Sequence, residues 1–131
     1  MKKKILIIMS PIIILLAVTY SVLLHDTDTV MDDFKNCMKG NVTSDTIKDT
    51  ELYRYYNRGE LCSSNISKAN INAKRMLVLH NFHKGIMLIK YDCEIFNKKG
   101  EIIYGSSNID AKWYIEKKNN RWEVVDVFEA P

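Results

Sequence analysis

The chain has 131 residues and a formal net charge of +3, and Lys2, Lys3 and Lys4 account for the whole of that excess. The residues from His25 onward therefore carry equal numbers of acidic and basic side chains. Nucleic-acid binding depends on a basic surface, so we expect no nucleic-acid partner. The length allows one small folded domain in addition to an N-terminal segment.

An uncharged, mostly aliphatic run from residue 5 to residue 24 follows the three lysines. About 20 helical residues, at about 1.5 Å each, span roughly 30 Å, which is the thickness of the hydrocarbon core of a bilayer. Because the run has no polar face, it predicts a transmembrane helix through which the chain contacts a membrane. The preceding lysines predict a cytoplasmic N-terminus and an extracytoplasmic remainder.

We assign residues 1–24 to a signal-anchor, residues 25–28 to a short linker and residues 29–131 to an extracytoplasmic domain of a single-pass cell-membrane protein. A cleaved secretory signal peptide would begin in the same way. The candidate processing sites at residues 17–19 and 19–21 match the Ala-x-Ala pattern poorly, and the apolar run continues beyond them. The anchor is therefore favoured, and cleavage would instead give a secreted domain.

Two apolar stripes predict two amphipathic helices. The first lies between Thr29 and Gly40, recurs at spacings of three and four, and consists of Val30, Met31, Phe34, Cys37 and Met38. The second, looser stripe lies between Asp45 and Gly59 and consists of Ile47, Leu52, Tyr55 and Tyr56. A glycine after each stripe predicts where each helix ends. Residues 60–70 are expected to form a loop.

Four segments rich in Ile, Val, Tyr and Trp predict β-strands at residues 71–82, 85–96, 101–116 and 121–129. Their connections are short and polar, so consecutive strands are expected to be antiparallel neighbours in a meander. Residues 105–108 interrupt the third strand and predict a bulge or bend.

Alternation along the second and third strands predicts one apolar sheet face and one mixed face. The apolar face consists of Met87, Ile89, Tyr91, Cys93, Ile95, Ala111, Trp113 and Ile115. The expected fold is therefore α+β, with two helices packed on one face of a curved four-stranded antiparallel sheet.

The C-terminal residues 113–117 (Trp-Tyr-Ile-Glu-Lys), residues 119–124 (Asn-Asn-Arg-Trp-Glu-Val) and Pro131 resemble the last hairpin of NTF2-like or cystatin-like domains, which occur in small exported proteins of Gram-positive bacteria. The resemblance extends over residues 29–131 in element order, but only over this hairpin in motif. It implies a cone-shaped α+β fold found in ligand-binding proteins, enzymes and membrane-anchored assembly subunits. The fold alone does not choose among these functions.

Three cysteines, Cys37, Cys62 and Cys93, permit one disulfide bridge in an oxidising compartment. Cys37 and Cys62 both lie in the helical half and form the preferred pair. Cys93 lies on the apolar face of the second strand and is expected to be buried. The alternative is that all three thiols are unpaired.

Candidate metal-binding and catalytic residues are few. His80 and His83 face opposite sides of a strand, so we interpret them as surface residues rather than as ligands of one metal ion. Asp92 and Glu94 alternate with Lys90 and predict a solvated strand face.

Asp110 and Asp126 lie on neighbouring strands, and an acid inside the cone can act as a base in enzymes that share the resemblance. No His or Tyr is placed beside either acid by the sequence. The chain also lacks a phosphate-binding loop, a Gly-x-Ser-x-Gly elbow, a Cys-x-x-Cys pair and a His-Glu-x-x-His helix. We therefore expect neither enzymatic activity nor a cofactor or metal site.

The candidate binding residues are Tyr55, Tyr56, Tyr91, Trp113 and Asp126. The aromatic members could line a pocket for an apolar or sugar ligand, but a small domain also needs such side chains for its core. Tyr55 and Tyr56, near a helix end, are the candidate contact surface.

These observations favour a membrane-anchored, non-enzymatic extracytoplasmic module that binds another cell-surface protein or takes part in an assembly. A domain that binds a small ligand in the interior of the cone is the first alternative. A small hydrolase-like or isomerase-like enzyme that uses Asp126 or Asp110 is the second.

Overall fold

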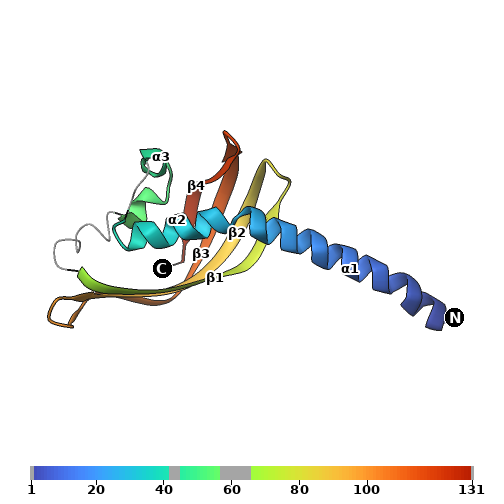
Figure 1. Ribbon diagram of the computed structural model, residues 1–131, viewed down its shortest axis with the longest axis horizontal. Helices are drawn as coiled ribbons and strands as arrows, with labels where there is room; N and C mark the ends of the chain where they lie inside the picture. The colour runs from blue at the N-terminus through green and yellow to red at the C-terminus, as the bar shows by residue number, and fades with distance from the viewer. Residues whose placement is uncertain (1, 42–44, 57–65, 131) are drawn as a thin grey trace.

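The computed structural model describes residues 2–41, 45–56 and 66–130, and it has an α+β fold (Figure 1). The elements in chain order are α1 (Lys2–Asp26), α2 (Asp28–Met38), α3 (Asp45–Lys48), β1 (Ile66–His80), β2 (Lys84–Asn97), β3 (Ile102–Lys118) and β4 (Arg121–Glu129). The strands form one antiparallel sheet in the order β1-β2-β3-β4. The helices α2 and α3 lie over one face of this sheet, whereas α1 projects away from it (Figure 1).

The helix α1 exposes apolar side chains on every side. The exposed members are Met9, Ile12, Ile13, Ile14, Leu15, Leu16, Val18 and Val22. Pro11 lies within the helix and does not end it. In the described part of the chain this is the one helix long and apolar enough to cross a membrane. An apolar surface all round a helix is stable in lipid but costly in water, so α1 has the character of a membrane anchor or a signal sequence.

The linker expected at residues 25–28 is helical almost throughout, so that prediction is wrong. The helix α1 continues to Asp26 and α2 begins at Asp28, which leaves only Thr27 between them. The Thr27 N–H and hydroxyl both donate to the carbonyl oxygen of Leu24, each at 3.1 Å. These bonds carry the chain across the break, and α2 continues along nearly the same line as α1 (Figure 1).

The helix α2 confirms the first predicted amphipathic helix. Its buried side chains are those of the predicted stripe: Val30, Met31, Phe34, Cys37 and Met38. Gly40 follows with a φ of 71°, a left-handed conformation that glycine adopts without steric cost. The helix therefore ends where the sequence indicates.

The second predicted helix is broken into two short pieces, so its prediction is wrong. The helix α3 stops at Lys48, and one more helical turn covers residues 53–56. Between them the Glu51 N–H donates to the Val124 carbonyl of β4 at 3.0 Å. This bond to the sheet replaces one that a continuous helix would have used.

The four strands confirm the predicted order and direction, with one difference in extent. The strand β1 begins at Ile66, so residues 66–70, expected in a loop, pair with β2 instead. The predicted interruption of β3 is a bulge, because the register between β2 and β3 shifts between Tyr91 and Cys93. Asn108 there has a φ of 58°, and its N–H donates to the Asp92 carboxylate at 2.7 Å.

The core lies between α2 and the inner face of the sheet. Every side chain assigned from the sequence to the apolar face is buried, from Met87 to Ile95 in β2 and from Ala111 to Ile115 in β3. Phe34 of α2 is fully buried at its centre, with its ring centroid 4.9–5.2 Å from those of Tyr55, Tyr91 and Trp113. One helical side chain thus joins three segments of the fold.

We predict that Phe34→Ala lowers the free energy of unfolding by about 3–5 kcal/mol, because it leaves a cavity among three aromatic rings. Chemical denaturation of the full chain in detergent micelles, followed by tryptophan fluorescence, measures the change. Ile102→Ala is the control, since Ile102 is 57% exposed. A loss for Phe34→Ala no larger than that of the control would contradict the assignment of Phe34 as the centre of the core.

Candidate functional site

Three of the predicted binding residues, Tyr55, Tyr91 and Trp113, come together in the interior. Hydrogen bonds join them, since Tyr55 and Tyr91 donate to the Glu129 carboxylate at 2.5 and 2.9 Å and Trp113 Nε1 donates to the Tyr55 oxygen at 3.3 Å. Each is at most 1% exposed. Burial, reinforced by the hydrogen bond to Glu129, raises the pKa of Tyr55 far above its ordinary value. These aromatics are packed core and do not line an open cavity.

Glu129 is the member of this cluster that the sequence interpretation missed. It lies two residues beyond Val127, which packs against the core from the same strand. Strand alternation therefore places both side chains on the inner face. The period-two rule, continued from the buried Trp122 and Val124, would have missed it, because the register between β3 and β4 shifts between Tyr114 and Ile115.

The remaining predicted residues lie at or near the surface. Tyr56 is half-buried and its ring stacks on that of Tyr53, with the centroids 5.1 Å apart. Asp126 and Asp110 are exposed, and Asp110 is 3.7 Å from the Lys90 ammonium. The hypothesis of an acid inside the cone is therefore wrong for both aspartates. Alternation turns Asp110 away from the core, whereas the register shift after Val124 turns Asp126 away.

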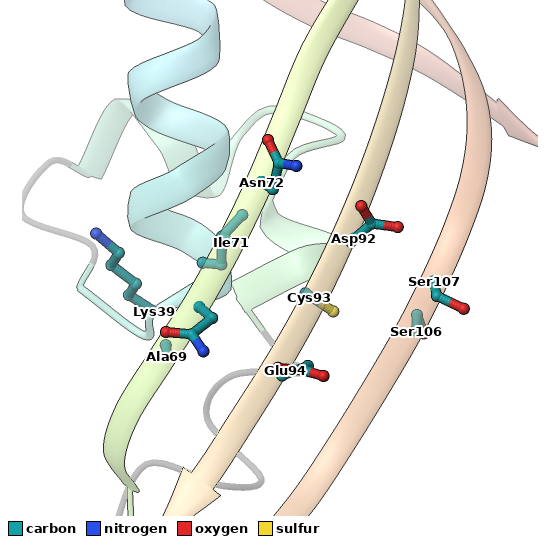
Figure 2. A pocket seen from close by; sticks show the side chains of 10 residues that line it. Lys39, Ala69, Ile71, Asn72, Asp92, Cys93, Glu94, Ser106 and Ser107 are labelled. Carbon is teal, nitrogen blue, oxygen red and sulfur yellow. The ribbon is translucent and has the colours of Figure 1, made fainter.

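A hollow of about 630 Å³ lies across β1, β2 and β3, near Lys39 at the end of α2 (Figure 2). Asp92 and Glu94 border it and are exposed, which confirms the predicted solvated strand face. Figure 2 shows the lining side chains spread along three strands and not directed at one point. Among the residues that the structure describes, no group of three metal-ligating side chains occurs. The described lining of the hollow therefore offers no set of ligands for a metal ion.

A group of exposed apolar side chains lies on the outer face of the sheet, opposite the helices. Cross-strand pairing aligns two rows of side chains there: Leu79, Ile86, Tyr114 and Asp126, and beside them Leu77, Leu88, Lys112 and Phe128. We call the six apolar members (Leu77, Leu79, Ile86, Leu88, Tyr114 and Phe128) the outer-face patch.

The outer-face patch is open to solvent. Leu79 is 49% exposed and Phe128 is 63% exposed, and Leu77, Ile86 and Leu88 are partly exposed between them. The Lys90–Asp110 ion pair and the exposed Asp92 and Glu94 bound the patch along the strands. An apolar area with a polar border is typical of a protein-interaction surface. The face predicted as mixed is thus divided into an apolar end and a polar middle.

A second cluster holds the end of α1 against the sheet. The Asp26 carboxylate accepts a hydrogen bond from Trp122 Nε1 at 2.6 Å and lies 3.7 Å from the Lys117 ammonium. His80 Nε2 lies 3.4 Å from the Leu23 carbonyl oxygen, and its ring packs on that of Trp122 at a centroid distance of 4.6 Å. We call this group, with Arg75, the anchor junction.

Arg75 completes the anchor junction from β1. Its guanidinium donates to the Leu24 carbonyl oxygen and to the Thr27 hydroxyl, and it forms an ion pair with Asp28 at 2.6 Å. A cation at the C-terminal end of a helix also interacts favourably with the helix dipole. Although burial acts to raise the pKa of Asp28, hydrogen bonds from Arg75 and His25 bring it below the ordinary value.

The His80 side chain is fully buried, so its prediction as a surface residue is wrong. Its Nδ1 accepts a hydrogen bond from the Phe82 N–H at 3.1 Å, which leaves the proton on Nε2, the nitrogen facing Leu23. His83 is exposed, as expected. Alternation separated the two histidines correctly, but the sequence carried no sign that α1 would cover the inner one.

The cysteine predictions have different outcomes. Cys93 is buried on the inner sheet face, as expected. Cys37 is buried in α2, and burial, with a smaller effect from Asp33, raises the pKa of its thiol to about 12. Cys62 lies outside the described residues, so its pairing with Cys37 stays a prediction.

The sequence matches no protein-family model and no curated protein.

We predict that Arg75→Met lowers the free energy of unfolding by about 1.5–3 kcal/mol, because a charged donor to backbone oxygen is lost. Denaturation of the full chain in detergent micelles measures the change. Lys74→Met is the matched control, since Lys74 is exposed on the same strand. An equal effect of the two substitutions would contradict the capping role of Arg75.

The ion-pair part of this effect depends on pH. A lowered pKa means that Asp28 stabilises the fold above its ordinary pKa of 3.8 and loses that contribution as the pH falls through the lowered value. The difference between wild type and Arg75→Met is therefore expected to narrow under strongly acidic conditions.

We predict that Cys37 resists alkylation in the native protein near neutral pH, because a thiol with a pKa of about 12 holds almost no thiolate there. Peptide mapping after iodoacetamide treatment of native and denatured protein, without reductant, measures this. Alkylation only after denaturation indicates a buried thiol. Resistance in both states would instead indicate the Cys37–Cys62 bridge, and rapid alkylation of native Cys37 would contradict its burial.

Proposed function

We propose that this chain is a membrane-tethered, extracytoplasmic and non-enzymatic module that binds another protein through the outer-face patch. The observation that carries the proposal is the combination of an exposed apolar anchor helix with an exposed apolar sheet face on one rigidly joined chain. The three lysines before the anchor support a cytoplasmic N-terminus. The resemblance to NTF2-like assembly subunits is in keeping with this function and stays a prediction.

The continuity of α1 and α2 supports a lateral orientation of the binding face. The sheet lies alongside the line of the two helices, so its outer face is turned sideways from the anchor axis (Figure 1). A face in this position is accessible to a partner held in the same membrane. The favoured occupant is therefore another membrane-associated protein.

The interior supports this proposal over the binding of a small ligand. Tyr91 and Trp113 would have to line a ligand cavity, but both rings pack against Phe34, edge-on for Tyr91 and tilted for Trp113, and both are almost completely buried. The exposed positions of Asp110 and Asp126 likewise remove the acids on which the enzymatic alternative depended. Binding at the surface is the function that these contacts leave best supported.

Photo-crosslinking in membranes of producing cells tests the proposal. When benzoylphenylalanine replaces Phe128, we expect a covalent adduct that remains in the membrane fraction after alkaline extraction. When it replaces Glu94, we expect no adduct. Glu94 is the matched control, because it is exposed on the outer face beyond the polar border. When the Leu79→Lys substitution is combined with benzoylphenylalanine at position 128, the adduct should be lost, because the lysine places a charge in the outer-face patch.

The adduct mass identifies the partner: a mass twice that of the chain indicates a second copy, and any other mass a different protein. Equal adducts at both positions, or an adduct unaffected by Leu79→Lys, would contradict the outer-face patch as the binding surface. Release of the chain by alkaline extraction would contradict the anchor.

A further inference from the structure

The turn between β1 and β2 lies level with the last turn of the apolar anchor. His80, the last residue of β1, places its Nε2 3.4 Å from the carbonyl oxygen of Leu23. The Phe82 ring meets the His80 ring edge-on, with the centroids 5.2 Å apart. Only one imidazole therefore separates Phe82 from the end of the apolar run at residue 24.

Phe82 occupies this turn in an exposed and unusual conformation. Its φ is 69°, which bulky residues seldom adopt, and it remains 51% exposed. The Asn81 side-chain oxygen accepts from the N–H groups of His83 and Lys84 at 3.0 and 2.9 Å and so holds the turn. The contact with His80 covers only part of the Phe82 side chain, whereas an apolar partner beyond the turn would give the exposed part a favourable environment.

The surroundings of the turn have the composition of a membrane interface. Trp122 packs behind His80, and the Lys117 ammonium lies 5.6 Å from the centre of the Trp122 ring. His83 and Lys84 are exposed beside Phe82. Aromatic rings and cations at the end of an apolar helix are typical of residues at the level of lipid headgroups.

We propose that the β1–β2 turn is a second membrane contact, in which the Phe82 ring inserts into the bilayer interface beside α1. The exposed Lys84, whose ammonium pairs with Glu116 at 3.2 Å, then lies at the level of the headgroups. This inference rests on the proposed anchoring by α1. The lipid bilayer is the favoured occupant because the turn is continuous, through His80 and Leu23, with the end of the proposed span. Two contacts of this kind would restrict the tilt and rotation of the domain, and thereby the direction of the outer-face patch.

Tryptophan depth measurements test the inference. The full-length variants Phe82→Trp and Ile102→Trp are reconstituted in phosphatidylcholine vesicles with and without bromine atoms on the acyl chains near the headgroup. Ile102 is the matched control, because it is 57% exposed and is the first residue of β3, which begins at the end of the sheet away from α1 (Figure 1). Emission of the wild type, which contains Trp113 and Trp122, is subtracted from both.

The expected result is that the brominated lipid removes most of the emission added by Phe82→Trp and little of that added by Ile102→Trp. Acrylamide, a quencher in the aqueous phase, should show the reverse order. Equal quenching of both variants, or no lipid quenching of Phe82→Trp, would overturn the second contact.

Alkaline extraction of the same vesicles separates this outcome from failure of the anchor. A chain that stays in the membrane but shows no lipid quenching at position 82 overturns only the second contact. A chain that is extracted overturns the anchor and the second contact together. Circular dichroism and the emission of Trp113 verify that each variant is folded before it is compared.

Discussion

The carbonyl groups at the end of the apolar helix α1 need hydrogen-bond partners, and the sheet supplies them. These last carbonyl groups have no partners within the helix, and each polar group left unsatisfied away from water is costly. Here Arg75 and His80 of β1 reach the carbonyl oxygens of Leu24 and Leu23, and Asp26 binds Trp122 of β4. The sheet thus completes the end of the anchor, and the two parts cannot turn independently without losing these bonds.

This connection also sets the position of the core. Because only Thr27 interrupts the helix, the direction in which α1 enters the domain decides where α2 lies on the sheet. The apolar side of α2 then meets the inner face, with Phe34 among the rings of Tyr55, Tyr91 and Trp113. Arg121, which binds Asp33 of α2 at 2.5 Å, ties the last hairpin to the same helix.

In a domain of this size, an aromatic side chain that is buried in the core is not available to bind another molecule. Among the described residues, five aromatic side chains are buried in the interior and supply apolar area that a small domain needs for stability: Phe34, Tyr55, Tyr91, Trp113 and Trp122. Residues able to interact with other molecules are consequently found at the surface, on the outer sheet face and at the turn beside the anchor. Both surfaces lie at the end of the sheet nearest to α1.

Short-period patterns of apolar residues were sufficient to predict most of the helices and strands. Spacings of three and four located α2 and its buried side chains, and alternation located the inner faces of β2 and β3. The second predicted helix failed because the pattern from Ile47 to Tyr56 could not show that the backbone of Glu51 binds β4. The prediction of a linker at residues 25–28 failed because the polar residues Asp26 and Asp28 have partners that lie more than 40 residues away in the sequence.

For the candidate sites too, the sequence predicted some features and could not predict others. Sequence composition selected Tyr55, Tyr91 and Trp113 but did not reveal that Phe34 closes the space among them. It described the outer face only as mixed, because the apolar rows form from four strands at once. The sequence by itself determined the long apolar helix, the class of fold and the buried faces, since these depend on neighbours within a few residues. Only the tertiary structure decided the anchor junction and the outer-face patch, because each is built from contacts between segments far apart in the chain.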